Sequence, residues 1–251
     1  MKNRIKRIER DETVHTYYIE NKGKLKKEMN KMLSLISPEL EKASGKKYGE
    51  LLDEIWMYYE TELLERFPYI GGNSVRGTSN LTGAYSFVAM GEVLKKYGST
   101  MEESAHLMVL SFERKALKIP SFIRKIMSKL ITNKKLLHKI FIKREIDNAA
   151  NAAKNPGSFE MKTQIPPEEG YDFSFHITSC PLANFAKQYG YEEYMPYLCN
   201  LDYVMLGTIG MPLFREHTCF EDGDYCDFKI KAGEKPMEYW PPVFTQGNGY
   251  K

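Results

Sequence analysis

The four cysteines are the residues of this chain best suited to chemistry, and they lie close together in the sequence. All of them fall within positions 180–226 of 251 residues, a clustering that argues for a shared site. Thiols in such a site can act as a nucleophile with supporting groups, as a redox pair or as a metal cage. The four residues are Cys180, Cys199, Cys219 and Cys226.

Cys180 has the sequence setting of an activated nucleophile. It ends a predicted strand and directly precedes Pro181, a residue that favours the first turn of a helix. The free N–H groups of a helix N-terminus stabilise a thiolate, so we expect a lowered pKa and a raised nucleophilicity for this thiol at neutral pH. The competing interpretation is that each cysteine is a small buried hydrophobic residue.

Polar residues at helical and strand spacing could assist this nucleophile. Asp202 lies three residues after Cys199 on the same helix face, where it could be a general base or an ordinary surface carboxylate. His176 lies four residues before Cys180 on the same predicted strand face, and could be an acid or base or a core histidine. We therefore predict as catalytic residues Cys180, Cys199, Asp202, His176 and His217.

Two further groups of residues could bind a substrate. Arg215 shares a predicted strand face with His217, and its guanidinium could hold a carboxylate through two hydrogen bonds. A glycine pair and several polar residues at positions 71–80 lead into the predicted helix 81–97. They could form an anion-binding nest or merely a connecting loop. They do not match a nucleotide-binding motif. The predicted substrate-binding residues are Asn73, Arg76, Asn80, Arg215 and Thr218.

A metal site is the alternative use of the same thiols. Four thiolates can bind Zn tetrahedrally, but the separations of 18, 19 and 6 residues lack the short knuckle of common zinc sites. A second possibility is that His217 or Asp202, together with a thiolate, binds a metal ion that activates a water molecule. The expected cofactor is therefore none or a divalent metal, Zn or Mn, whose ligands in this alternative would be Cys180, Cys199, Cys219 and Cys226.

Composition narrows the class of protein. The net charge of +3 lacks the concentrated basic excess of a nucleic-acid binder. The charged N-terminus has no apolar signal-peptide core, and no apolar run is long enough to span a bilayer. We expect a soluble cytoplasmic protein with reduced cysteines and a small-molecule substrate, without nucleic acid or integral membrane association. A homo-oligomer is left open.

The stretch from Lys118 to Arg144 is basic and amphipathic, with several isoleucines on one side. Such a stretch could lie on an anionic membrane surface. The more common arrangement, which we expect here, is a helix whose apolar side faces the core while its basic side is solvated.

Hydrophobic periodicity predicts an α+β fold. Apolar residues at helical spacing fill the first 155 residues, and alternation appears after the turn at Asn155-Pro156-Gly157. We predict a helical N-terminal layer (1–155) packed on a small antiparallel sheet with flanking helices (156–251), integrated in one domain. The predicted helices cover 21–35, 48–67, 81–97, 101–117, 121–131, 134–154, 181–189 and 192–206, and the strands 170–178, 213–220 and 225–231.

Several of these residues lie in motifs that resemble the L-2-amino-thiazoline-4-carboxylic acid hydrolase family. The motifs are HITSC-PLANFAKQYG, LC-x2-DY and REHT-x7-CDFKI, with PYIGGNSVRGTSNL upstream. Glu216-His217 stands where the family has Thr-Gln, and Cys219 where it tends to have an apolar residue. The family positions fall on Cys180, Cys199, Asp202, Arg215, Thr218, Cys226, Asp227 and Phe228.

This resemblance implies a hydrolase acting on a C–N or C–S bond of a small cyclic amide-like or amidine-like substrate, such as a 2-aminothiazoline carboxylate. A cysteine nucleophile with aspartate and histidine assistance would carry the reaction. The C-terminal hairpin also resembles that of four-vinyl-reductase-like ligand-binding domains. The alternative function is therefore a non-catalytic small-molecule sensor or binding module with a cysteine-ligated structural metal.

Overall fold

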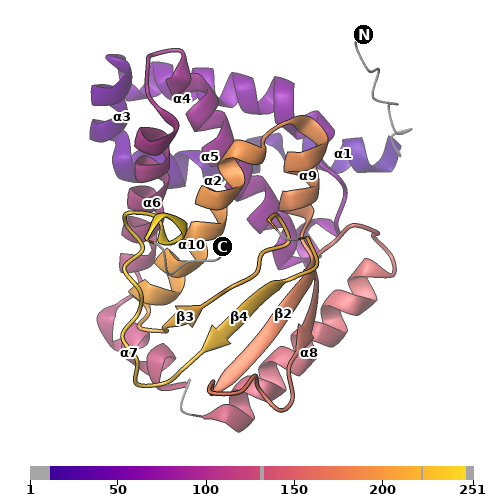
Figure 1. Cartoon of the computed structure of the whole chain (residues 1–251). Helices are drawn as coiled ribbons and strands as arrows, with labels where there is room; N and C mark the ends of the chain where they lie inside the picture. The colour runs from indigo at the N-terminus through magenta and orange to yellow at the C-terminus, as the bar shows by residue number, and fades with distance from the viewer. Residues whose placement is uncertain (1–11, 131–132, 222, 247–251) are drawn as a thin grey trace.

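The computed structural model of the protein describes residues 12–130, 133–221 and 223–246. It confirms the α+β fold, with a layer of helices above a four-stranded antiparallel sheet (Figure 1). The helices are α1 (Glu12–Glu20), α2 (Lys22–Leu33), α3 (Ser37–Ser44), α4 (Tyr48–Tyr58), α5 (Arg76–Lys95), α6 (Met101–Leu117), α7 (Ser121–Leu130), α8 (Lys134–Ala152), α9 (Pro181–Tyr189) and α10 (Met195–Thr208).

Local sequence signals determine where several helices begin and end. Helix α6 spans the predicted residues because Thr100 and Glu103 form the expected capping box. Helix α9 also matches, with Pro181 in its first turn and Gly190 in the left-handed conformation after its last. The predicted helix 48–67 is instead α4 followed by a π turn (Tyr59–Leu63) and a 3-10 turn (Leu64–Arg66). Helices α1 and α3 were not predicted, and the end of the 121–131 helix lies outside the described residues.

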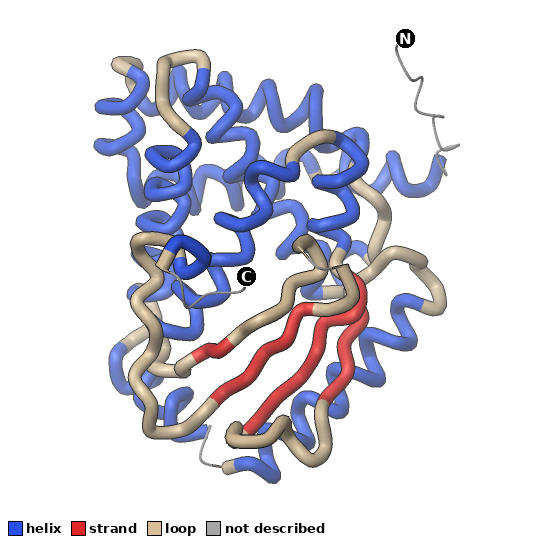
Figure 2. The backbone as a smooth tube through the Cα atoms, in the orientation of Figure 1, coloured by secondary structure: helices blue, strands red, loops and turns tan. Residues whose placement is uncertain are grey.

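The sheet has the strand order β1-β2-β4-β3, and its strands are β1 (Glu160–Thr163), β2 (Phe173–Ser179), β3 (Leu213–Phe214) and β4 (Cys226–Ile230). Strand β1, which pairs antiparallel with β2, was not predicted. Strand β3 was expected to reach Phe220, but it stops at Phe214 and the chain continues as a loop (Figure 2). The centre of the predicted hairpin turn, Asp222, lies outside the described residues.

The two faces of the sheet have different surroundings. On the inner face, Phe175 of β2 and Phe228 of β4 pair in register and stack with ring centroids 4.5 Å apart. Phe141 of α8 packs against Phe175 from below, and Cys226 further along β4 joins the main core. On the outer face, His176 lies opposite Asp227. One side of the sheet is therefore apolar and covered by helices, while the other is polar.

The main core lies among α2, α4, α5, α6, α9 and α10 and is rich in aromatic rings. Phe185 of α9 is at its centre, with Tyr85 of α5 at 4.5 Å and Phe67 at 5.2 Å between ring centroids. Helices α9 and α10 thus connect the helical layer to the sheet. Among the described residues, no helix is both long and apolar enough to cross a bilayer.

Helix α7 contradicts the arrangement that we expected for the basic stretch. None of its residues is buried, so its apolar side does not face the core. Helix α8 does pack on the sheet, but only through a narrow side that includes Leu137, its one buried residue.

Candidate functional site

The fold brings the four cysteines together at the upper end of the sheet. Cys180 joins β2 to α9, Cys199 lies in α10, Cys219 lies in the loop between β3 and β4, and Cys226 begins β4. The N–H group of Cys219 donates to Sγ of Cys226 at 3.1 Å. Burial raises the pKa of Cys180 and of Cys199 most, and a charge on Cys226 raises each of them further. We call these four residues the thiol cluster.

A buried arginine lies beside the thiol cluster. The Arg215 side chain is 1% exposed, and its Nη2 donates to Oδ2 of Asp202 at 2.8 Å. The guanidinium also lies 4.1 Å from the ring centroid of Phe228 and donates to the carbonyl oxygen of Cys199. The Asp202 side chain is 47% exposed, so this carboxylate links the buried guanidinium to solvent. Because Asp202 already occupies Arg215, a substrate carboxylate would have to compete for the guanidinium.

The surroundings of Cys226 favour its thiolate form. Hydrogen bonding to Cys219 lowers the pKa of Cys226 most, burial opposes it, and the positive charge of Arg215 lowers it further. For Cys219 the same hydrogen bond and its own burial raise the pKa. The Cys219 thiol donates its hydrogen to the carbonyl oxygen of Ile177 at 3.2 Å. The pair therefore has one preferred thiolate, Cys226, and one preferred thiol, Cys219.

Cys180 shows the opposite balance to the one predicted. The N–H groups of Ala183 and Leu182 at the start of α9 do lower its pKa, as a helix N-terminus should. Burial is the larger effect, however, and with the negative charge on Cys226 it raises the pKa of Cys180 to about 12. Cys180 is nevertheless only partly buried, whereas Cys219 and Cys226 are buried. Cys180 is thus a partly exposed residue at the edge of the core whose thiol stays protonated.

Tyr85 is a neighbour of the thiol cluster that sequence reasoning missed. It is fully buried in α5, and its hydroxyl donates to the carbonyl oxygen of Leu182 at 2.8 Å. A charge on Cys180 raises the pKa of this tyrosine, after the larger effect of burial. No signal in the sequence distinguishes Tyr85 from the other buried residues of α5, because only the tertiary packing places it against α9.

The two histidines predicted to assist catalysis lie away from the thiol cluster, on the outer face. His176 bonds through Nε2 to Oε1 of Glu168 at 2.7 Å and stacks on Tyr225, whose ring also contacts His217. The prediction that His176 and Cys180 share a strand face fails because β2 ends at Ser179, and Cys180 turns into the core. Likewise, β3 ends before Arg215, so Arg215 and His217 point to opposite sides of the sheet.

A second buried ion pair explains why β3 ends where it does. The carboxylate of Asp227 accepts hydrogen bonds from the backbone N–H groups of Glu216 and His217, at 2.7–3.0 Å. Nζ of Lys229, whose side chain is 4% exposed, lies 2.8 Å from the same carboxylate. Burial raises the pKa of Asp227, but these bonds together outweigh it and lower the pKa. Asp227 therefore holds the loop that positions Arg215.

The remaining predicted substrate-binding residues are used locally. The hydroxyl of buried Thr218 accepts from the N–H of Glu221 at 3.1 Å within a turn. Oδ1 of Asn73 accepts from Tyr17 and Lys24, and Arg76 and Asn80 are exposed at the start of α5. The loop before α5 packs on the end of α8, where Asn151 donates to the carbonyl oxygen of Ile70. These contacts are those of a connecting loop.

Within the described ranges 12–130, 133–221 and 223–246, no group of three or more histidine, cysteine, aspartate or glutamate side chains is arranged to hold a metal ion. The cysteines therefore lie together without the convergent arrangement that a four-sulfur zinc site needs.

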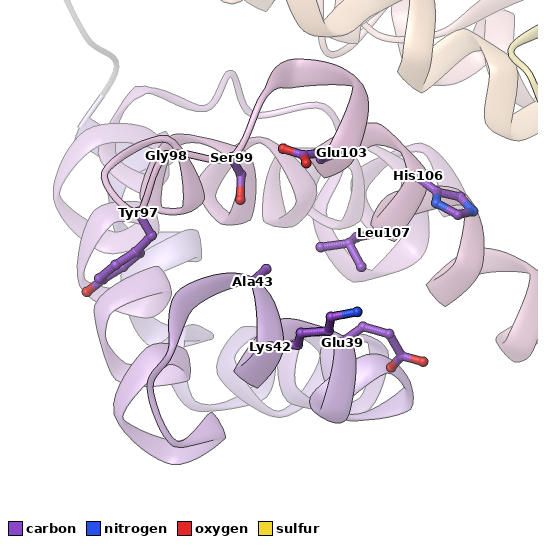
Figure 3. Close-up of a pocket in the computed structure, with 9 residues that line it drawn as sticks. All are labelled: Glu39, Lys42, Ala43, Tyr97, Gly98, Ser99, Glu103, His106 and Leu107. Carbon is purple, nitrogen blue, oxygen red and sulfur yellow. The ribbon is translucent and has the colours of Figure 1, made fainter.

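A cavity of about 430 Å³ opens elsewhere, between α3 and α6 (Figure 3). Its wall includes Glu39, Lys42, Glu103 and His106 but none of the four cysteines. Glu39 pairs with Arg114 and Glu103 caps α6, so two of its carboxylates already stabilise the fold. We therefore place the candidate site at the thiol cluster.

Comparison with known families supports that choice. The family model described as L-2-amino-thiazoline-4-carboxylic acid hydrolase matches residues 85–230, which is more than half of the chain. The chain belongs to this family. The same comparisons found no curated protein and no solved structure that matches this chain.

In this member of the L-2-amino-thiazoline-4-carboxylic acid hydrolase family, the matched region runs from Tyr85 to the end of β4. It contains all four cysteines, the Arg215–Asp202 pair and Asp227. The loop before α5 and the cavity residues of α3 lie outside it. The part of the chain that the family shares is therefore the part that builds the thiol cluster.

Proposed function

We propose that this protein is a hydrolase whose active site is the thiol cluster. Its substrate would be a small carboxylated ring with a cleavable C–N or C–S bond, such as a 2-aminothiazoline carboxylate. Membership of the family supports the reaction class. The observation that carries the proposal is that Cys226, whose pKa is lowered, and partly exposed Cys180 lie in one cluster beside the buried Arg215 guanidinium and its half-exposed partner Asp202.

In the proposed reaction, Cys180 is the nucleophile and Cys226 accepts its proton. The Cys180 sulfur adds to the ring carbon between nitrogen and sulfur, and the ring C–N or C–S bond breaks as its leaving atom takes the proton back from Cys226, which returns to the thiolate. Burial raises the pKa of Cys180 most, and transfer of a proton to Cys226 removes the second cause, the negative charge on Cys226, so the attacking thiolate becomes easier to form. The N–H groups at the start of α9 stabilise this thiolate.

Asp202 is placed to act in the second half of the reaction. Its carboxylate is held by Arg215 on one side and is open to solvent on the other. It could therefore orient and deprotonate a water that attacks the carbon bound to Cys180, which releases the product and restores the thiol. In this proposal Arg215 is a positioning residue, because its Nη2 group is already engaged by Asp202.

The experiment is a turnover assay on the purified chain with 2-aminothiazoline carboxylate and a panel of hydantoins and related cyclic amides. We expect ring opening of at least one compound, and a loss of about 100-fold or more for Cys180→Ser and for Cys226→Ser. Cys219→Ser is the matched control, because the backbone N–H group that donates to Sγ of Cys226 is kept and the serine hydroxyl can still donate to the carbonyl oxygen of Ile177, so most of the activity should remain. A folded protein that opens no ring in the panel would contradict the proposal.

A trapping experiment separates the role of Cys180 from that of its neighbour. Acid quenching during turnover, followed by mass spectrometry of peptides, should show the substrate adduct on Cys180. An adduct on Cys226 would reverse the two assignments.

A further inference from the structure

Helix α7 packs on the rest of the protein through its polar side. Arg124 donates through Nη1 to the carbonyl oxygen of Thr208 at 3.3 Å, and the Cβ atom of Ser128 lies against Gly210. Arg124 and Ser128 are four residues apart and so share a helix face. This face is directed at the end of α10.

The apolar side of α7 points away from the protein. Phe122 and Ile126 share the opposite face, because each is two residues from Arg124, and two residues turn an α-helix by roughly 200°. They are 63% and 55% exposed, and Ile123 beside them is 37% exposed. The usual orientation of an amphipathic surface helix is thus inverted, which leaves an apolar ridge in water.

Exposed apolar residues are concentrated on this part of the chain. Of the ten large hydrophobic residues that are most exposed among the described residues, eight lie between Leu117 and Ile146. Helix α7 and the start of α8 lie together at the lower end of the molecule, away from α3 and α4 (Figure 1). The eight are Leu117, Phe122, Ile123, Ile126, Leu136, Ile140, Ile142 and Ile146.

Positive charge is concentrated on the same stretch. Residues 118–144 contain nine of the 36 Lys and Arg residues and none of the 33 Asp and Glu residues. The rest of the chain therefore carries 27 basic and 33 acidic residues and is negative overall. Lys118, between α6 and α7, and Lys125, three residues after Phe122 in α7, are both exposed.

We propose that α7, with the basic residues of α8, is a docking surface for the anionic face of a lipid bilayer. Exposed Phe and Ile side chains bordered by lysines are the composition of helices that lie in a membrane interface, where the apolar side enters the acyl boundary and the cations meet anionic headgroups. The protein would bind peripherally, with the thiol cluster facing the aqueous phase.

Charge and composition favour this occupant over two others. A second copy of the chain would bring two surfaces of the same strong positive charge together, which is unfavourable. A single-stranded nucleic acid needs aromatic rings for its bases, and Phe122 is the one aromatic ring among the eight exposed residues.

Co-sedimentation of the full chain with vesicles tests the proposal. We expect binding to vesicles of phosphatidylcholine with phosphatidylglycerol, little binding to phosphatidylcholine alone, and weaker binding as NaCl is raised. The variants Phe122→Ser/Ile126→Ser and Lys118→Glu/Lys125→Glu should each reduce binding by about tenfold or more.

Matched controls keep the test specific. Met57 and Ile165 are as exposed as Phe122 but lie elsewhere, so Met57→Ser/Ile165→Ser should bind as the unmodified chain does. For charge, the control is Lys27→Glu/Lys235→Glu, which changes two exposed lysines outside the stretch. All of these side chains are exposed, so thermal unfolding should change little.

Three results would overturn the proposal. One is the absence of binding to anionic vesicles, and another is equal loss in the control variants. The third is a dimer, detected by light scattering without lipid, that Phe122→Ser/Ile126→Ser dissociates, since a second copy would then cover the ridge.

Discussion

Replacing Asp202 by asparagine should destabilise the folded chain by about 1–2 kcal/mol, because it removes the charge of the carboxylate that is paired with the buried Arg215 guanidinium. Asparagine keeps the shape of the side chain and can still accept the hydrogen bond from Nη2, so the change is mainly one of charge. The Arg215 side chain is 1% exposed and cannot turn to water.

The magnitude follows from the unequal exposure of the two partners. Breaking a fully buried pair costs about 3–5 kcal/mol, and breaking an exposed one costs at most about 1 kcal/mol. Here one partner is buried and the other, Asp202, is 47% exposed, which places the cost between these limits. In an Arg215→Met background no charge is stranded, so Asp202→Asn should cost almost nothing there.

Urea denaturation of the unmodified chain, both single variants and the double variant measures this coupling directly. As a control, Asp53→Asn removes a surface pair with Lys26, in which the Asp53 side chain is 72% exposed, and should change stability by less than about 0.5 kcal/mol. If Asp202→Asn costs the same with and without Arg215, the reasoning that the arginine depends on this carboxylate is refuted.

Three further predictions concern the thiols and the packing of α5. The pKa of Cys180 is raised to about 12 in the folded chain. The contribution of this thiol to stability is therefore complete below its unfolded pKa of about 8.5, and above that pH it should be lost at about 1.4 kcal/mol per pH unit. Urea titrations at pH 8–10 should show that the free energy of unfolding falls less steeply with pH in Cys180→Ala, and an unchanged slope would contradict the assignment. A Cβ atom on Gly91 would lie 2.6 Å from the ring of Tyr194, whereas one on Gly83 of the same helix meets nothing within 4 Å. Gly91→Ala should therefore lower the free energy of unfolding by about 1–3 kcal/mol, and Gly83→Ala should raise it by up to about 1 kcal/mol. A higher melting temperature for Gly91→Ala than for Gly83→Ala would be inconsistent with this packing. Iodoacetamide should modify partly buried Cys180 before buried Cys219, as peptide mass spectrometry at short times would show; faster labelling of Cys219 would mean that the loop before β4 opens.

Much of the secondary structure could be predicted from local signals. The limits of α6 and α9 follow from a capping box, a proline and a glycine, all of which act within one helical turn. The short elements α1, α3 and β1 were missed because few residues carry their patterns, and contacts with other elements stabilise them. The failure at β3 has a specific cause: Asp227 accepts the backbone N–H groups of Glu216 and His217.

The grouping of the four cysteines, the type of fold and the family were all determined by the sequence, because they depend on which residues occur and in what order. The state of each thiol was decided only by the tertiary structure. The pKa of a cysteine depends on burial and on charges from other elements, and here Arg215 and Cys219 favour the thiolate of Cys226 while burial keeps Cys180 protonated. The outward apolar side of α7 is likewise a tertiary result, because periodicity defines two sides of a helix but not which of them meets the protein.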